Sequence, residues 1–219
     1  MELAILIPVL RRPQNVCPLL QSIEANTPMD MDYDVIFITS PGDVEEQQEI
    51  NKHVATLLHM DRPFENRGDY ARKINYTYTQ VQADWYFLGA DDLSFHAGWY
   101  EAARAVGKPV TGTNDLGNQR VIRGEHATHS LVSRTYVETY GTIDQRGRVL
   151  HEGYPHEYVD DEFVETAKRR RSWGFAKDSI VEHLHPNWGK APVDDIYMQQ
   201  AQRMIRGRQL YQQRRRLWK

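Results

Sequence analysis

The chain of 219 residues holds a single cysteine, Cys17, so a disulfide within the chain is excluded. Scarcity of cysteine suits a reducing compartment. The sequence also lacks any run near the ~18 consecutive apolar residues of a membrane-spanning helix. Met1 and Glu2 lead directly into the apolar segment 3–9 without a basic leader, which favours a strand over a signal peptide. We therefore expect a cytoplasmic protein.

Glycine is missing where several nucleotide-binding folds require it. Residues 8–13, Pro-Val-Leu-Arg-Arg-Pro, follow the apolar segment 3–9 and contain none. Dinucleotide-binding folds and P-loops need glycine at this point so that a phosphate can approach the backbone. The loop therefore argues against both folds, and against nucleotidyltransferases of similar topology. It offers Arg11 and Arg12 instead, which suit a phosphate or a base edge, or are surface arginines of a turn.

The composition fits one compact domain, since 40% of the residues are hydrophobic and 26% are charged. The charges are unevenly distributed. Residues 168–219 carry 13 Lys or Arg against 4 Asp or Glu, whereas residues 1–167 carry 14 against 26. The acidic part suits a metal ion, and the basic part suits phosphate, an acidic lipid or nucleic acid. A solvated basic helix is the simpler interpretation of the C-terminal part.

The first part of the chain alternates between apolar segments and helix-like ones. We predict strands over 3–9, 34–39, 54–59 and 84–89, with helices over 14–26, 43–53 and 70–81. Pro13 lies near the start of the first helix. Strands that alternate with helices predict a parallel sheet with right-handed crossovers, which makes this part a Rossmann-like α/β half.

Beyond residue 92 the alternation becomes irregular. Here we predict helices over 96–106, 158–170 and 193–216, strands over 109–113, 119–123, 128–132 and 179–184, and a Gly/Arg-rich loop over 141–153. The seam between the two halves lies near residues 92–108. We do not expect the halves to be independent domains.

The most informative segment is 84–92, Asp-Trp-Tyr-Phe-Leu-Gly-Ala-Asp-Asp, an apolar run that ends in Asp91 and Asp92. A buried strand carries charge only where it leaves the sheet, so the pair is expected at its carboxyl end, where open α/β sheets bind ligands. Adjacent carboxylates repel each other unless a cation lies between them, and oxygen ligands favour Mg²⁺ or Mn²⁺. A solvated turn or a helix cap is the alternative.

Segment 65–75 opens the helix that precedes this acidic strand. Asp69 is placed to cap the helix, and Arg67, Arg72 and Lys73 gather positive charge near its N-terminus. A helix N-terminus is itself a site for anions, so a diphosphate suits this position. A capped surface helix explains the same residues.

Asp160, Asp161 and Glu162 begin the helix predicted over 158–170. The helix macrodipole alone favours acids in a first turn. A carboxylate that faces a cleft can instead act as a general base toward an acceptor hydroxyl. Successive helix positions diverge by ~100°, so the three acids cannot all face one ligand. We favour Asp161 as the base, followed by Asp160.

Two histidines, His183 and His185, stand at the end of the strand predicted over 179–184. Alternate residues of a strand point to the same face. One imidazole could therefore complete a metal site that includes Asp91, while the other fixes it or contacts phosphate. Structural or solvated histidines are the alternative.

In chain order these motifs resemble those of the GT-A-fold nucleotide-sugar glycosyltransferases, particularly compact bacterial and bacteriophage members of glycosyltransferase family 2. The resemblance extends to about residue 192 and is carried by the arginine turn, segment 66–72, Gly89-Ala90-Asp91-Asp92, Asp160-Asp161-Glu162 and segment 182–186. It implies a Rossmann-like GT-A fold with a mostly parallel central sheet flanked by helices, a mixed α+β acceptor-side half and a C-terminal helix.

The domain organisation that follows is one catalytic domain over residues 1–192. Residues 1–92 form its nucleotide-sugar-binding half and residues 93–192 its acceptor-side half. Residues 193–219 form a basic C-terminal helix or tail. A bacteriophage origin implies the host cytoplasm as the location.

In that family an Asp-x-Asp motif binds ribose and a divalent metal that bridges the donor diphosphate. The resemblance therefore implies Asp91 as a metal ligand with Asp92 beside it, and His183 or His185 as the late histidine ligand. Gly89 replaces the first Asp of the motif, and Thr39 stands where a base-recognising acid is usual. The implied donor-binding residues are Pro8, Leu10, Arg11, Thr39, Arg67, Asp69, Arg72, Ala90, Asp91 and Asp92.

The implied reaction is transfer of a sugar from a nucleoside diphosphate to an acceptor hydroxyl, with Mn²⁺ or Mg²⁺ as cofactor. UDP is the leading donor nucleotide, and Asp161 or Asp160 matches the family's base. In-line attack inverts the anomeric centre, although some metal–histidine members of the fold retain it. The acceptor stays open between a protein, a modified DNA base, a lipid and a glycan. The basic C-terminus suits contact with an acidic surface.

Two other functions use the same residues. A two-metal nuclease or phosphoesterase could be built from Asp91, Asp92, Asp161, Glu162 and His185, with the basic tail on nucleic acid. A non-catalytic binding module could keep a decayed transferase fold. The ordered Rossmann-like half favours the transferase.

Overall fold

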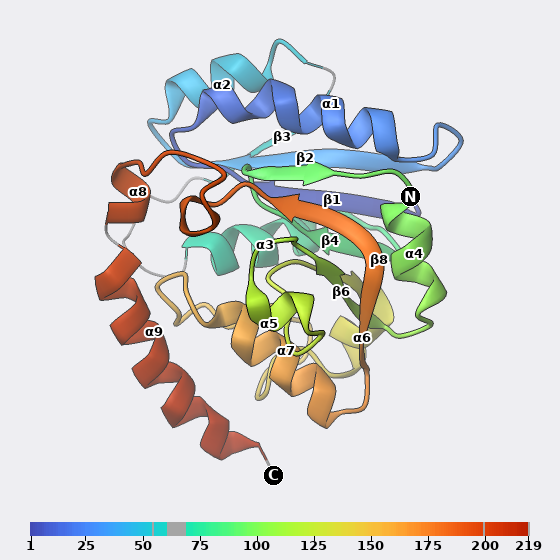
Figure 1. The fold of residues 1–219 in the computed structure, drawn as a ribbon, viewed down its shortest axis with the longest axis vertical. Coiled ribbons are helices and arrows are strands. Elements are labelled where there is room, and N and C mark those ends of the chain that lie inside the picture. The colour runs from blue at the N-terminus through green and yellow to red at the C-terminus, as the bar shows by residue number, and fades with distance from the viewer. Residues whose placement is uncertain (54, 61–68, 199, 219) are drawn as a thin grey trace.

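The computed structural model describes residues 1–53, 55–60, 69–198 and 200–218, and one eight-stranded sheet organises them (Figure 1). The strands are β1 (Leu3–Pro8), β2 (Tyr33–Thr39), β3 (Thr56–His59), β4 (Trp85–Leu88), β5 (Leu93–Phe95), β6 (Val110–Asn114), β7 (Ser130–Ser133) and β8 (Trp173–His183). The α-helices are α1 (Val16–Asn26), α2 (Val44–Ile50), α3 (Asp69–Gln80), α4 (Trp99–Ala105), α5 (Gln119–Ile122), α6 (Arg134–Thr139), α7 (Val159–Arg169), α8 (Asp195–Met198) and α9 (Gln200–Arg214).

The sheet is mostly parallel, in the order β3-β2-β1-β4-β7-β6-β8-β5. β1 pairs in parallel with β2 and β4, β2 with β3, and β6 with β8. Only β7 and β5 run against their neighbours in the described sheet. The carboxyl ends of β1, β4 and β8 therefore meet at one edge, which is the ligand-binding edge of an open α/β sheet.

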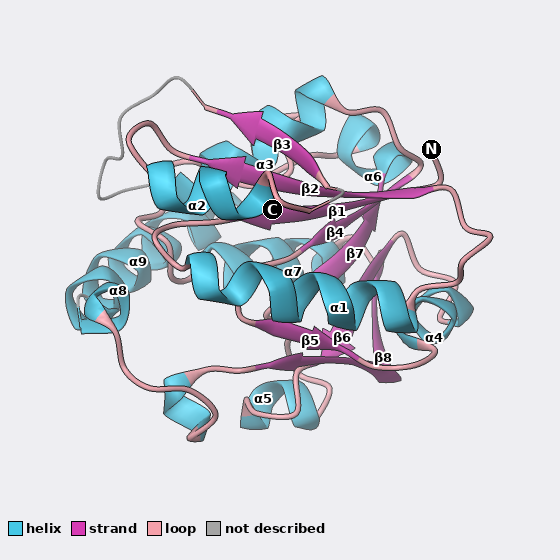
Figure 2. Cartoon of the chain, turned by 90° about the horizontal axis from the view of Figure 1, so that it is seen from above, coloured by secondary structure: helices cyan, strands magenta, loops and turns pink. Residues whose placement is uncertain are grey.

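Alternate side chains of β1 enter two different cores. Leu3, Ile5 and Ile7 pack with the apolar faces of α1 and α4 on one side of the sheet. Ala4 and Leu6 pack with α3, α6 and α7 on the other side. Figure 2 shows these helices on either side of the sheet. A strand covered on both faces must be apolar throughout, which explains the unbroken hydrophobic run in β1.

The strand predicted over 119–123 is wrong, because α5 occupies Gln119–Ile122. The side chain of Asn118 accepts a hydrogen bond from the backbone N of Arg120 at 3.0 Å and so caps a helical turn. The helix α6 was not predicted, and it begins in a similar way. There the hydroxyl of Ser133 accepts from the backbone N of Tyr136 at 3.2 Å.

Two other boundaries differ from the prediction. β8 begins at Trp173 rather than near residue 179, because its first residues pair with β6 in parallel. The helix predicted over 193–216 corresponds to α8, which begins at Asp195, and α9, which ends at Arg214, while residue 199 between them lies outside the described residues. α9 runs beside α7, where Leu210 and Tyr211 pack against the core (Figure 1). Within the described ranges, every helix is too short or too polar to cross a membrane.

Candidate active site

A cavity of about 400 Å³ opens at the carboxyl edge of the sheet. Its walls come from the loop after β1, the residues after β4, the starts of α3 and α7, the end of β8, and the segment from α8 into α9. It is lined by ten of the residues predicted for the site, namely Pro8, Leu10, Asp69, Ala90, Asp91, Asp92, Asp160, Asp161, His183 and His185. The sheet topology thus gathers residues that are far apart in the sequence.

Four predicted donor-binding residues are not among those that line the cavity. Arg67 lies outside the described residues. Thr39 is fully buried, and its hydroxyl lies 3.2 Å from Nδ1 of His59. Arg11 and Arg72 belong to the described residues but are absent from the cavity lining. Donor contacts of these residues stay predictions.

The turn after β4 buries both acids of the Asp-Asp pair. Asp91 and Asp92 are 6% and 9% exposed. Two positions earlier, a Cβ on Gly89 would lie 2.6 Å from Cδ1 of Ile7 and 3.0 Å from the carbonyl oxygen of Leu6. The close approach of β1 therefore leaves little room for a side chain at position 89. This packing accounts for glycine where the related motif has its first aspartate.

A guanidinium group lies between the two acids. Nη1 of Arg12 is 3.1 Å from Oδ1 of Asp91 and 3.6 Å from Oδ2 of Asp92. Arg12 follows β1 and is itself buried. The backbone N of Arg12 donates to Oε2 of Glu46 at 2.6 Å, which fixes the loop beneath the guanidinium. The cation that two adjacent carboxylates require is thus supplied here by the chain itself.

The end of β8 brings His183 to the same acids. Its Nε2 lies 3.3 Å from Oδ2 of Asp92, and the backbone N of Leu184 donates to the carbonyl of Asp92 at 2.8 Å. His185 lies beyond the strand end, with its ring centroid 4.9 Å from that of His183. Nδ1 of His185 accepts from the backbone N of Asn187 at 3.0 Å, so the neutral ring carries its proton on Nε2, which can donate to an anion.

Burial and neighbouring charges push the pKa values of the two acids apart. Burial, followed by the charge of Asp92, raises the pKa of Asp91 to about 7. Burial also opposes ionisation of Asp92, but the nearby His183 and its hydrogen bond hold the pKa of Asp92 well below its usual range. The same contact raises the pKa of His183, against the effect of burial.

These residues fit a divalent cation. Oδ1 of Asp92 is buried and has no hydrogen-bond partner among the described residues. A buried carboxylate oxygen without a partner destabilises the fold unless a bound ligand interacts with it. Carboxylate oxygens together with an imidazole nitrogen form a donor set suited to Mn²⁺.

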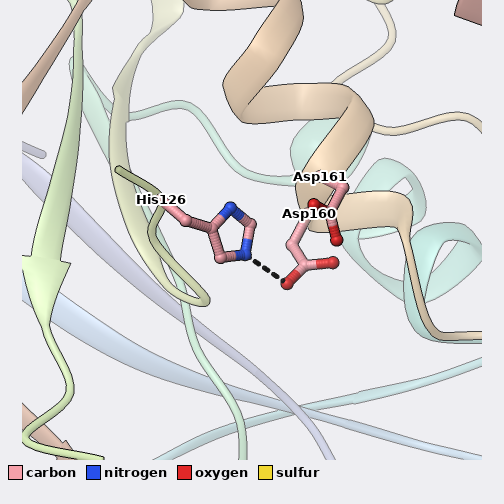
Figure 3. A group of neighbouring side chains, drawn as sticks. All are labelled: His126, Asp160 and Asp161. Atoms are coloured by element: carbon pink, nitrogen blue, oxygen red, sulfur yellow. Dashed lines mark hydrogen bonds and ion pairs between the residues drawn. The ribbon is translucent and has the colours of Figure 1, made fainter. Parts of the chain in front are cut away.

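A second pair of acids lines the cavity at the start of α7, and Figure 3 shows them beside His126. Nε2 of His126 lies 3.0 Å from Oδ2 of Asp160, and Nη1 of Arg120 lies 2.8 Å from Oδ1 of Asp161. Glu162 points into the interior instead, where it accepts from the hydroxyl of Tyr154 at 2.7 Å. The predicted divergence of the three acids is therefore observed.

The two acids differ in their electrostatic surroundings. Burial and the neighbouring Asp160 raise the pKa of Asp161. Burial acts on Asp160 as well, but the hydrogen bond and the charge of His126, together with the backbone N–H of Asp161 and the charge of His156, outweigh it and lower the pKa of Asp160. Ligand atoms of Asp160, Asp161 and His126 all lie within 4.8 Å of one another, so this group could also hold a cation. A pair of acids with separated pKa values suits one ionised group beside one stronger base.

Arg12, Arg120, His126 and Tyr197 line the cavity but were not predicted as site residues. The glycine-free loop after β1 indicates Arg12 as a candidate phosphate contact, together with Arg11. Arg120 belongs to the segment that was predicted as a strand. His126 and Tyr197 stand in no local pattern of acids or glycines, so no sequence signal marked them.

The fold is the GT-A fold of nucleotide-sugar glycosyltransferases, and the predicted fold class is confirmed. Glucosyl-3-phosphoglycerate synthase from Mycobacterium tuberculosis, solved with Mn²⁺, UDP and glucosyl-3-phosphoglycerate, is similar with a TM-score of 0.62 and 12% sequence identity, covering 94% of this chain and 78% of that one. Mannosyltransferase PcManGT from Pyrobaculum calidifontis, solved with GDP-Man and Mn²⁺, is similar with a TM-score of 0.61 and 14% sequence identity, covering 94% of this chain and 62% of that one.

S. aureus TarS is also similar, with a TM-score of 0.59 and 13% identity, covering 83% of this chain and 36% of TarS. This chain thus spans about a third of TarS, and 59% of the TarS fragment 1–349. No protein-family model and no curated protein matches the sequence. At these identities the likeness concerns the fold, and membership of glycosyltransferase family 2 stays a prediction.

Proposed function

We propose that this chain is a metal-dependent glycosyltransferase that moves a sugar from a nucleoside diphosphate, with UDP as the first candidate, to an acceptor hydroxyl with inversion. The observation that carries the proposal is that two pairs of acids line one cavity. Asp91 and Asp92 lie with His183 where β4 and β8 end, and Asp160 and Asp161 line the same cavity from the start of α7. Neighbours with this fold were solved with nucleotide sugars and Mn²⁺.

In this proposal Asp91, Asp92 and His183 hold Mn²⁺ or Mg²⁺, with His185 beside them. A bound divalent cation supplies the positive charge that neutralises a leaving diphosphate. Residues 1–92 then contribute most of the donor side. Residues 93–192 contribute the acceptor side and also His183 of the metal site.

Asp161 is the proposed base. It accepts the proton of the acceptor hydroxyl while that oxygen attacks C1 of the sugar, from the side opposite the nucleotide. Its raised pKa makes it a stronger base than an exposed aspartate, which favours proton transfer near neutral pH. Asp160, held by His126, stays ionised and orients the acceptor.

The test uses donor hydrolysis, in which water replaces the unidentified acceptor. The protein is incubated with UDP-sugars and GDP-sugars with and without Mn²⁺, and the released nucleotide is measured. Asp91→Asn is expected to abolish the Mn²⁺-dependent rate. Asp161→Asn is expected to keep nucleotide affinity, measured by calorimetry, and to lower the rate by about 100-fold or more.

Asp178→Asn is the matched control, since Asp178 is exposed on β8 away from the cavity lining. It should leave both affinity and rate unchanged. A near-wild-type rate for Asp161→Asn would remove Asp161 from the reaction. Cleavage of DNA or RNA without nucleotide binding would favour the nuclease instead.

A further inference from the structure

Arg12 lines the cavity and is held by three carboxylates. Besides its contacts with Asp91 and Asp92, its Nε donates to Oδ2 of Asp194 at 2.7 Å. The guanidinium also lies over the ring of Tyr197, 4.5 Å from the ring centroid. Burial lowers the pKa of Arg12, but these acids, led by Asp91, more than offset burial and raise it, so the group stays charged.

The contacts to Arg12 from the C-terminal side come from one short segment, Asp194 and the helix α8. The backbone N of Tyr197 donates to Oδ1 of Asp194 at 3.0 Å, so one turn of chain presents both groups. The hydroxyl of Tyr197 donates to Oδ2 of Asp92. Its ring packs on His185 at a centroid distance of 4.5 Å. α8 thus binds the very residues proposed to hold the donor and its cation.

Two atoms in this cluster are left incomplete. Nη2 of Arg12 and Oδ1 of Asp92 are both buried without a hydrogen-bond partner among the described residues. Both residues line the cavity. A buried guanidinium nitrogen without a hydrogen-bond acceptor is stabilised by an anion, and a buried carboxylate oxygen without a donor is stabilised by a cation. A diphosphate with its divalent cation supplies one of each.

We propose that Arg12 is a donor-binding residue that occupies the place of the divalent cation between Asp91 and Asp92 in the free protein, and turns to the donor diphosphate when the cation binds. The inference rests on the proposed function. A guanidinium and a divalent cation repel each other strongly when they share the same carboxylate oxygens in a poorly solvated site. A diphosphate between them removes the conflict, because Arg12 then contacts phosphate and the cation contacts the acids.

The exchange couples the donor to α8. When Arg12 leaves the acids, its ion pair with Asp194 and its stacking on Tyr197 are broken or rebuilt, and a cation at Asp92 competes with the hydroxyl of Tyr197. α8 therefore opposes entry of the cation alone and yields to the cation with the nucleotide. Arg12 is expected to weaken binding of the metal alone and to strengthen binding of the nucleotide.

The test measures two affinities by calorimetry, Mn²⁺ alone and UDP in saturating Mn²⁺. Arg12→Gln is expected to bind Mn²⁺ about tenfold more tightly and UDP about tenfold more weakly than the wild type, each corresponding to ~1.4 kcal/mol. Tyr197→Phe keeps the ring and removes only the bond to Asp92. It should tighten Mn²⁺ binding by about threefold, from the loss of one charge-assisted hydrogen bond, and thermal unfolding checks that both variants fold.

Arg104→Gln is the matched control, because Arg104 also stacks on an aromatic ring, that of Trp85 at 3.9 Å, but outside the cavity lining. It should change neither affinity. Weaker binding of both ligands to Arg12→Gln would overturn the exchange and indicate a structural arginine. Unchanged Mn²⁺ affinity in both site variants, or no Mn²⁺ binding at all, would also overturn it. If Arg12→Gln bound Mn²⁺ more tightly but neither it nor the wild type bound a nucleotide, competition between Arg12 and the cation would be supported, and the proposed function would be overturned.

Discussion

The loop after β1 depends on a buried acid, Glu46, that is not among the residues lining the cavity. Glu46, in the first turn of α2, is fully buried and accepts the backbone N of Arg12 through Oε2. Its Oε1 has no hydrogen-bond partner among the described residues. Burial raises the pKa of Glu46 from 4.5 to about 7, so the folded protein resists its ionisation.

This gives a pH-dependent prediction for Glu46→Gln. An acid whose pKa is raised on folding contributes stability below its unfolded pKa, and loses that contribution as the pH rises to its folded pKa. Glutamine keeps an acceptor for Arg12 and has no charge to bury. Glu46→Gln should therefore be more stable than the wild type at pH 8, by up to about 3 kcal/mol for a rise from 4.5 to about 7. The advantage should shrink toward pH 4.5.

Urea unfolding at several pH values measures this difference. Glu45→Gln is the control, since Glu45 is exposed in the same helix, and it should change the free energy of unfolding by less than about 0.5 kcal/mol. If the advantage of Glu46→Gln were the same at pH 5 and pH 8, ionisation of Glu46 would not be its cause.

Single residues of the site could be predicted where they interrupt a regular pattern. Asp91 and Asp92 end an apolar run, and Asp160 and Asp161 begin a helix, so local sequence marks them. Arg12 and His126, which contact these acids, do not interrupt a regular pattern in the sequence. Arg12 lies 79 positions before Asp91, and His126 lies 34 before Asp160, so only the folded sheet shows these pairs.

At the level of elements, the regular βα half was predictable because strands and helices of ordinary length alternate there. The second half was not, because its elements are short and depend on neighbours. β5 has three residues and α5 has four, too few for a period to be recognised. The antiparallel β7 between β4 and β6 is set by tertiary pairing, which no local signal encodes.

The helix α9 is fixed to the loop before α7 by a close approach at Gly207. A Cβ at this position would lie 2.4 Å from the backbone carbonyl oxygen of Glu157. Nε of Arg203 also contacts both carboxylate oxygens of Glu157, at 3.0 and 3.2 Å. The next residue, Tyr158, has a positive φ of 72°. α9 therefore supports a strained turn two residues before Asp160.

Gly207→Val is expected to destabilise the fold. Replacing glycine inside a helix gains less than about 1 kcal/mol of helix propensity. The clash with a backbone oxygen costs about 1–3 kcal/mol or more, since backbone cannot move aside as a flexible side chain does. Urea unfolding should show a net loss, whereas Gln209→Ala on the exposed side of α9 should stay within about 0.5 kcal/mol. An unchanged or raised stability for Gly207→Val would contradict the close packing.

Across the whole molecule, the basic C-terminal part is not a uniformly solvated helix. Arg214 is buried and bonds Glu162 at 2.7 and 3.0 Å and Asp144 at 2.8 and 3.0 Å. One of the positive charges of the C-terminal part is thus neutralised by two acids of the preceding domain. Exposed arginines remain for an acidic surface, and that contact stays a prediction: Arg206, Arg208, Arg215 and Arg216.

Arg214→Met tests whether the C-terminal helix stabilises the whole domain. Methionine keeps the apolar stem but leaves Glu162 buried at 4% exposure without its counter-charge. Breaking a buried ion pair from one side costs about 3–5 kcal/mol, which should appear in urea unfolding and as a lower Tm. The exposed Arg208→Met should cost less than about 0.5 kcal/mol. Adding Glu162→Gln to Arg214→Met should recover much of the loss, because it removes the unpaired charge and keeps an acceptor for Tyr154. If the double variant were no more stable than Arg214→Met, the loss would come from packing of α9 rather than from the buried charge.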